Sequence, residues 1–338
     1  MEENKIKTIG VLTSGGDAPG MNAAVRAVVR TAIARGLKVK GIKRGYFGLL
    51  NEEIFDMTSK SVSNTISKGG TILYTARCEE FKNADVQAKG AEICRKHGID
   101  GLVVIGGDGS FRGAGKLAEL GINTVGIPGT IDLDITCTDY TIGFDTAVNT
   151  AMEAIDKIKD TSMSHERCSI IEVMGRNAGY IALWCGMATG AENILIPERF
   201  DGNLPATELQ LVENILASRA KGKNHHIIVN AEGVGHSYGM AKRLEDATGI
   251  ETRATILGHM QRGGNPTAVD RMHASMMGAY AVDLLLKGGN KRVVAYKHGE
   301  YVDYDIQEAL AMTKDIDAYE LEVAKIVGKT MGDYHEVR

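Results

Sequence analysis

Short apolar runs alternate with helix-length segments along most of the chain. The run at 102–105 is apolar throughout and the run at 124–127 contains one polar residue, Thr124, without an alternating pattern, as is typical of parallel strands covered by helices on both faces. Helix-length segments include 21–36, 146–160 and 267–286. The same pattern places further strands at 5–13, 168–173, 193–197, 226–233, 251–257 and 292–296. This alternation predicts an α/β fold with doubly wound, mainly parallel sheets.

The length of 338 residues indicates about two compact units, at roughly 150 residues each. No Pro- or Ser-rich linker divides the chain, so linker composition does not reveal a boundary. We predict a larger lobe at 1–138 with a returning segment at about 255–305, a smaller lobe at 139–254, and a C-terminal helical segment at 306–338.

Charge and composition exclude several classes of partner. The 39 basic and 43 acidic residues give a net charge of −4, and a nucleic-acid or anionic-membrane partner requires a basic surplus. No apolar run approaches the roughly 18 residues of a membrane span, and the charged first ten residues do not resemble a secretion signal. The five cysteines are odd in number and form no C-x-x-C pair, which favours reduced thiols. We therefore expect a cytoplasmic protein that binds neither nucleic acid nor membrane.

Glycine accounts for 41 residues, well above the usual ~7%, and it clusters where strands end and helices begin. In 13–22 (TSGGDAPGMN), Gly15 and Gly16 can present backbone N–H groups to a phosphate, although an ordinary glycine turn explains them equally well. In 106–110 (GGDGS), Asp108 can hold Mg²⁺ between phosphate oxygens, or it can be a turn or N-cap residue. The second loop is neither a Walker A motif nor a G-x-G-x-x-G motif.

A third loop carries two carboxylates. Asp132 and Asp134 follow the strand that ends near Pro128, and in extended backbone their side chains would share a face. Phosphoryl transfer to an alcohol needs one carboxylate to accept the hydroxyl proton and another to manage the metal. Two solvated loop acids are the alternative interpretation.

Basic residues gather in a fourth region. The segment RATILGHMQRGG at 253–264 contributes Arg253, His259 and Arg262, and arginine is the preferred partner of a phosphate group. Arg167 and the MGR motif ending at Arg176 lie upstream. Surface arginines without a ligand remain the alternative for each one. Two further arginines, Arg26 and Arg30, are spaced i, i+4 on the first helix and share one face. They could form salt bridges with acidic residues at the surface, or they could bind an anion.

Taken together, these motifs resemble the bacterial type of ATP-dependent 6-phosphofructokinase. The resemblance runs from about Ile9 to Leu286 through TSGGDAPGMNAA, VVIGGDGS, GIPGTID, TDYTIGFDTA, EVMGR and ETRATILGHMQRGG, and it is weak over the last fifty residues. It implies two Rossmann-like, doubly wound lobes with the active site between them. It also implies a homotetramer that phosphorylates fructose 6-phosphate at its 1-hydroxyl with Mg²⁺ and ATP, the committed step of glycolysis, under allosteric control.

Carried over by position, the resemblance implies residue roles in four groups. ATP contacts fall at Gly16, Arg77, Cys78, Gly107, Asp108, Gly109 and Ser110, with Asp108 on Mg²⁺. The catalytic residues are Asp132 as proton acceptor, Asp134, Thr130, Arg77 and Arg176. Fructose 6-phosphate contacts fall at Thr130, Ile131, Asp132, Met174, Gly175, Arg176, Glu232, His259, Met260, Gln261 and Arg262, with Arg167 and Arg253 reaching in from a neighbouring subunit. ADP or phosphoenolpyruvate as effector would meet Arg26, Arg30, Lys159, Gly190, Ala191, Glu192, Lys221, Lys223, Asn224 and His225.

Two glycines indicate the phosphoryl donor. In pyrophosphate-using relatives an acid follows the GGD aspartate and a lysine precedes the TID threonine. Here the two positions are Gly109 and Gly129, which leave room for ATP and place no carboxylate against its phosphates. The resemblance therefore implies ATP.

The chain departs from the family pattern at a few positions. Leu133 replaces the asparagine of the family's TIDND loop, and at the effector positions Ser59, Asn64 and Lys159 replace family residues. These changes leave effector identity open, because lysine offers a point charge and not a planar fork. Two rival functions are a catalytically weak sensor of nucleotide and sugar phosphate, supported only by Leu133, and a relative of the NAD or lipid kinases. The second shares the GGDG loop but does not explain GTIDLD or GHMQRGG.

Overall fold

The computed structural model describes residues 6–328, which divide into two compact units. Unit 1 contains the chain up to Thr146 and the returning segment Arg262–Lys314. Unit 2 contains Ala147–Gln261 and the chain from Asp315 onward. The boundaries that we predicted at 138 and 254 fall a few residues before these. The predicted C-terminal segment at 306–338 is shared between the units, and its part beyond residue 328 lies outside the described residues.

Unit 1 is built on a seven-stranded sheet with the order β11-β10-β5-β4-β1-β2-β3. Its five central strands run parallel, while β3 and β11 pair antiparallel at the two edges. The strands are β1 (Thr8–Thr13), β2 (Lys38–Ile42), β3 (Ile54–Met57), β4 (Gly101–Gly106), β5 (Asn123–Pro128), β10 (Arg292–Lys297) and β11 (Glu300–Asp305). The predicted α/β fold with mainly parallel sheets is confirmed.

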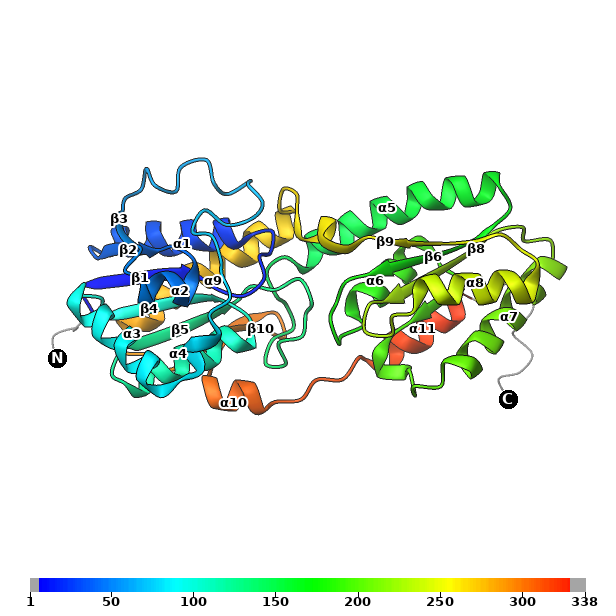
Figure 1. Ribbon diagram of the computed structural model, residues 1–338. Coiled ribbons are helices and arrows are strands. Elements are labelled where there is room, and N and C mark those ends of the chain that lie inside the picture. Colours follow the sequence, from blue (N-terminus) through cyan, green and yellow to red (C-terminus); the bar gives the residue numbers. More distant parts are fainter. Residues whose placement is uncertain (1–5, 329–338) are drawn as a thin grey trace. The chain divides into compact units, whose positions relative to one another are not determined.

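Helices cover both faces of this sheet (Figure 1). One face carries α1 (Met21–Ala34) and α9 (Ala268–Leu286), which pack against each other. The other face carries α2 (Gly45–Leu50), α3 (Ala84–Lys96), α4 (Asp108–Glu119) and α10 (Ile306–Ala311), with a 3₁₀ turn η1 (Glu79–Lys82).

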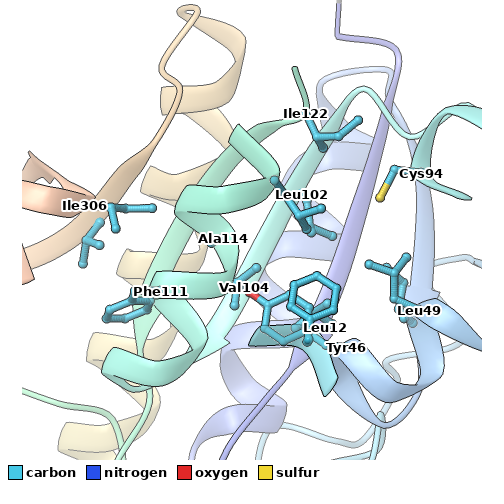
Figure 2. Close-up of a cluster of buried hydrophobic side chains, with 14 of the residues drawn as sticks. Leu12, Tyr46, Leu49, Cys94, Leu102, Val104, Phe111, Ala114, Ile122 and Ile306 are labelled. Atoms are coloured by element: carbon cyan, nitrogen blue, oxygen red, sulfur yellow. The ribbon is translucent and has the colours of Figure 1, made fainter. Parts of the chain in front are cut away.

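The core beneath α4 holds the start of that helix in place. Figure 2 shows Leu12, Leu102 and Val104 of the sheet beneath Phe111 of α4 and Tyr46 of α2. The Tyr46 ring stacks on Phe81 at 4.2 Å between centroids, and its hydroxyl donates to the Ser110 carbonyl at 2.5 Å. Burying a Phe or Leu side chain contributes roughly 1.5–3 kcal/mol, so the loop before α4 rests on a rigid base.

Unit 2 has a four-stranded, fully parallel sheet with the order β7-β8-β6-β9. Its strands are β6 (Cys168–Val173), β7 (Asn193–Leu195), β8 (His226–Ala231) and β9 (Thr252–Ile256). Of its helices, α7 (Leu204–Ala220) and α8 (Ser237–Thr248) pack together, as do α6 (Tyr180–Thr189) and α11 (Ala318–Gly328). The remaining elements are α5 (Phe144–Ser164), which carries the chain from unit 1 into unit 2, and the 3₁₀ turns η2 (Pro197–Arg199) and η3 (Gly258–Arg262).

The hydrophobic pattern does not predict β2 or the two edge strands β3 and β11. The sequence of β11, EYVDYD, contains three acids and no continuous apolar run, because an edge strand is only partly covered. Within residues 6–328, no helix combines the length and the apolar character needed to cross a membrane.

Candidate active site

Three glycine-containing loops follow β1, β4 and β5, which are neighbours in the sheet of unit 1. The carboxyl ends of parallel strands lie at one edge, where open α/β sheets bind ligands. Backbone hydrogen bonds join the loops directly: the Ser14 N–H donates to Ile105 at 2.9 Å, and the Gly129 N–H donates to Gly106 at 3.0 Å. The structure therefore brings together the loops that the sequence singled out.

Gly106 lies where the first two loops meet, and its lack of a side chain permits their approach. A Cβ atom at this position would lie 2.4 Å from the Ser14 carbonyl oxygen and 2.6 Å from the Ser110 Oγ. The first of these is a backbone atom, which cannot move aside without shifting the loop. The sequence pattern does not single out Gly106 from its neighbours.

Gly106→Ala is expected to lower the free energy of unfolding by about 1–3 kcal/mol, because overpacking forces the backbone to move. Denaturant unfolding measures the change. Gly115→Ala is the matched control, since a Cβ there would lie at an ordinary 3.4 Å from Ile306 and alanine favours the interior of α4. Equal stability of the two variants would show that the contact does not constrain the loops.

The second loop places a carboxylate at the positive end of a helix. Asp108 is the first residue of α4 and is half-buried, while Gly109 is exposed with open space beside it. The backbone N–H groups of a helix N-terminus form a ready anion site. The geometry therefore suits a phosphate beside a carboxylate.

The second and third loops are neighbours. A Cβ atom at Gly107 would lie 3.9 Å from the Ile135 Cδ1. Burial, and then the negative charge of Asp108, raise the pKa of the Cys137 thiol to about 11. Asp108 thus lies near the chain that immediately follows Asp132 and Asp134.

The third loop is largely buried. Asp132 is 6% exposed, and its N–H donates to the Thr130 Oγ1 at 3.2 Å. Leu133 is also buried and adopts a φ of 55°, in the left-handed region that asparagine tolerates far better than leucine. Leu133, in place of the family's asparagine, therefore lacks both the polar side chain and the tolerance of this backbone conformation that asparagine provides.

Two further segments border the first loop. The Thr75 Oγ1 donates to the Gly15 carbonyl at 2.6 Å, which brings the following residues, exposed Arg77 and half-buried Cys78, toward this edge. The Arg262 Nη1 donates to the Asp17 carbonyl at 3.1 Å. A cation thus lies directly beside the first glycine loop.

The donor set fits a magnesium ion that is shared with a nucleotide. Among residues 6–328 no cluster of three or more His, Cys, Asp or Glu side chains could hold a metal ion. Mg²⁺ is usually held by one or two carboxylates together with substrate phosphates, and does not need such a cluster. Asp108, at a helix start with open space beside Gly109, meets that requirement.

A second group of predicted residues gathers at the carboxyl end of the unit 2 sheet. The Glu232 Oε1, after β8, accepts from the Gly175 and Arg176 N–H groups at 3.3 and 2.5 Å. The buried Gln261 accepts from the Met174 N–H at 2.8 Å. The Arg176 side chain is exposed, and so are two side chains of η3, His259 and Met260.

Arg167 and Arg253 lie elsewhere. Both contact Glu251, at 3.4 and 2.8 Å, beside the first residues of β6 and β9. This is the amino end of the sheet, opposite the end where Met174 and Glu232 lie. Within unit 2 the structure does not bring these two arginines to the other predicted sugar-phosphate residues.

The predicted effector residues divide between the units. In unit 2, the Lys159 Nζ donates to the Thr189 carbonyl at 2.8 Å, beside Gly190, and Lys223 pairs with Glu192. Burial, followed by the charges of Lys223 and Lys159, lowers the pKa of His225. Also in unit 2 are Ala191, Lys221 and Asn224, whereas Arg26 and Arg30 lie on α1 of unit 1.

Sequence reasoning missed Asp270, a fully buried carboxylate in the first turn of α9. The available signal was Thr267 three residues before it, since S/T-x-x-D/E marks a helix start. That motif predicts a capping role within α9 only, and the structure shows wider contacts.

Taken together, the two units present glycine loops, helix N-termini, carboxylates and arginines at the carboxyl ends of parallel strands, which defines an α/β protein built to bind phosphorylated ligands. Residues 8–285 match the family model described as Phosphofructokinase. The chain belongs to the phosphofructokinase family.

Relatives match along nearly the whole chain. The ATP-dependent 6-phosphofructokinase of Clostridium acetobutylicum is 58% identical over 325 residues, covering 96% of this chain and 100% of that protein. The enzyme of the same name from Clostridium botulinum strain Loch Maree is 58% identical over 324 residues, with the same coverage.

Solved structures share the fold. Phosphofructokinase from Saccharomyces cerevisiae superposes with a TM-score of 0.83 at 35% identity, over 95% of this chain and 48% of the longer yeast chain. A pyrophosphate-dependent phosphofructokinase from Marinobacter aquaeolei gives a TM-score of 0.82 at 22% identity, over 96% of this chain and 92% of that chain. The fold alone therefore does not distinguish the phosphoryl donors.

Proposed function

We propose that this protein transfers the terminal phosphoryl group of ATP to the 1-hydroxyl of fructose 6-phosphate, giving fructose 1,6-bisphosphate and ADP. This is the committed step of glycolysis, and we place the protein in the cytoplasm. The full-length similarity to enzymes named ATP-dependent 6-phosphofructokinase supports this function. The observation that carries it is the meeting of the GGDGS and TIDLD loops at one sheet edge of unit 1.

In this mechanism Asp132 accepts the proton of the 1-hydroxyl. A carboxylate at the acceptor oxygen contributes typically 10²–10⁴-fold to such a transfer. Thr130 and Ile131 contact the sugar, and Asp134 supports the metal and a sugar hydroxyl. Because Asp132 is buried, bulk water has little access to the carboxylate that accepts the proton.

The nucleotide phosphates bind at the start of α4, over Gly107, Gly109 and Ser110. Asp108 would hold Mg²⁺, which offsets the charge of the nucleotide's phosphates when it is bound. Arg77 contributes a further positive charge, and Gly16 and Cys78 contact the nucleotide. The residues of this chain thus act by positioning and by electrostatics, without a covalent intermediate.

The sugar phosphate binds through the group at the carboxyl end of the unit 2 sheet. Glu232 orients the backbone of Gly175 and Arg176, so that the exposed guanidinium of Arg176 is free to meet a phosphate. The remaining contacts of the unit 2 group are Met174, His259, Met260 and Gln261. Arg262, the last residue of η3, completes the proposed set and lies in unit 1 beside the first glycine loop.

We further propose a homotetramer with shared sites. Arg167 and Arg253 lie at the opposite end of the unit 2 sheet from Arg176, so they cannot serve the same subunit's sugar-phosphate group. Their proposed ligand is the fructose 6-phosphate of a neighbouring subunit.

A coupled assay of fructose 6-phosphate phosphorylation tests the function. We expect turnover with Mg²⁺ and ATP and none with Mg²⁺ and pyrophosphate, since Gly109 and Gly129 leave room for a nucleotide. Turnover with pyrophosphate would refute the donor. Binding of both substrates without turnover would favour a sensor.

Allosteric regulation is also part of the proposal. ADP or phosphoenolpyruvate is expected to bind the cations Lys159 and Lys223, beside His225, and to shift the fructose 6-phosphate saturation curve by at least about fivefold, the lower end of ordinary allosteric coupling. Titrating each compound against that curve measures the shift. No shift with either compound would reject allosteric control by these effectors.

A further inference from the structure

Asp270 accepts four hydrogen bonds from one short stretch of chain, and no part of the mechanism above uses it. Its Oδ1 accepts from the Tyr140 hydroxyl and the Gly143 N–H, both at 2.6 Å. Its Oδ2 accepts from the Thr146 N–H at 2.9 Å and the Thr146 hydroxyl at 2.5 Å. The carboxylate is 0% exposed, so each donor depends on it.

Two of the four donors, Tyr140 and Gly143, bound a stretch at residues 140–143 that is called the strap below, and the other two are on Thr146 at the start of α5. The strap pairs with the third loop, because Ile142 donates to the Pro128 carbonyl at 2.9 Å and forms a β-bridge with Gly129. A Cβ atom at Gly143 would lie 3.2 Å from the Ile131 Cγ2. The strap therefore packs directly against the residue between Thr130 and Asp132.

The strap also contacts the first glycine loop. A Cβ atom at Gly143 would lie 2.7 Å from the Ala18 Cβ, and one at Gly20 would lie 2.6 Å from the Ile142 Cγ2. The interior packs like a crystal of small molecules, so a displaced strap would displace both loops.

Capping of its own helix does not account for the contacts of the Asp270 carboxylate, two of which come from Thr146 in the first turn of α5. In a capping box the acid would reach back to its own N-cap residue, Thr267. Instead the Thr267 N–H donates to the Thr146 hydroxyl at 3.0 Å, and the Thr267 hydroxyl donates to Asp145 at 2.5 Å. The first turns of α5 and α9 are thus joined to each other, and the Asp270 carboxylate is directed at Thr146 with one oxygen and at the strap with the other.

Aromatic packing fixes Tyr140, whose side chain donates to Asp270 from the strap. The Tyr140 ring stacks on His273 of α9, with centroids 4.0 Å apart, and the Tyr301 hydroxyl is 3.0 Å from the His273 Nδ1. His273, which Tyr301 contacts, therefore fixes the orientation of the Tyr140 ring, whose hydroxyl donates to Asp270.

We propose that Asp270 is a positioning residue for phosphoryl transfer, which holds the strap against Ile131 and thereby sets the place of Asp132 relative to the sugar hydroxyl. This inference rests on the function proposed above. A misplacement of about 1 Å in such a site costs on the order of 10² in rate, without a matching loss of ligand binding.

Two variants test the inference. Tyr140→Phe removes one donor and leaves the backbone unchanged, and we expect kcat to fall about 3–10-fold with the KM for ATP within about twofold. Asp270→Asn keeps the shape but turns an NH₂ group toward the donors, and we expect kcat to fall about 10–100-fold. Tyr280→Phe is the matched control, because Tyr280 also lies on unit 1 and donates to a carboxylate, that of Asp303 at 3.0 Å. Its kcat is expected to stay native.

A double-variant cycle separates positioning from a general loss of stability. If the strap acts through Asp132, Tyr140→Phe should cause no further loss of turnover when it is added to Asp132→Asn. Additive losses, or a native kcat in Tyr140→Phe, would overturn the inference even if Asp270→Asn fails to fold. Absence of ATP-dependent turnover in the unmodified protein would instead refute the proposed function, and the inference with it.

Discussion

Asp132→Asn is expected to lower kcat for fructose 6-phosphate phosphorylation by about 10²–10⁴-fold, with the KM values of both substrates within about threefold. Asparagine has the shape of aspartate but cannot accept the hydroxyl proton. The Thr130 hydroxyl can still accept from the backbone N–H of residue 132, so the loop keeps its local hydrogen bond. Steady-state kinetics with both substrates varied provide the measurement.

Asp139→Asn is the control for this experiment. Asp139 lies seven residues further along the chain, is exposed, and pairs with Lys297 at 2.8 Å. An exposed ion pair contributes only about 0–1 kcal/mol, so the control should keep native turnover. Near-native turnover in Asp132→Asn would remove Asp132 from the mechanism.

Gly109→Asp is expected to raise the KM for ATP by about 10–100-fold. The open space beside Gly109 accepts a side chain, and an acid in the first turn suits the helix. The new carboxylate would, however, lie beside the proposed position of the nucleotide phosphates, and like charges about 4 Å apart near a protein surface repel by several kcal/mol before screening. The effect should therefore appear in ATP binding and not in folding.

Gly109→Ala separates charge from volume. It adds a Cβ atom in the same open space without a charge, so its KM for ATP should stay within about threefold and its stability should equal or exceed that of the unmodified protein. A KM unchanged in Gly109→Asp would mean that the triphosphate does not bind over this turn.

The sequence predicts the strands whose own composition shows that both of their faces are buried. β1, β4 and β5 read as apolar runs because helices cover both faces, and the carboxyl-end rule then brings their loops together. β3 and β11 lie at sheet edges, where the burial that marks a strand is incomplete. Their pairing follows from the neighbours they meet in the fold and not from a local pattern.

The same distinction holds for the candidate site. Asp108 and Asp132 lie in sequence motifs that indicate a chemical role. Gly106 and Asp270, in contrast, are important because of contacts with residues far away in the sequence, Ser14 for Gly106 and the strap for Asp270. No window of sequence contains both members of such a contact. Arg167 and Arg253 are a third case, because the ligand that we propose for them would belong to another subunit.

Leu133 adds a last consequence. A bulky residue with positive φ costs roughly 1–2 kcal/mol relative to its preferred backbone, and this one adjoins the proposed base. The excised loop peptide would relax to another shape, so its native curvature is imposed from outside, by the surrounding packing of unit 1. Heating or local unfolding that loosens this packing is therefore expected to abolish enzymatic activity before the protein unfolds globally.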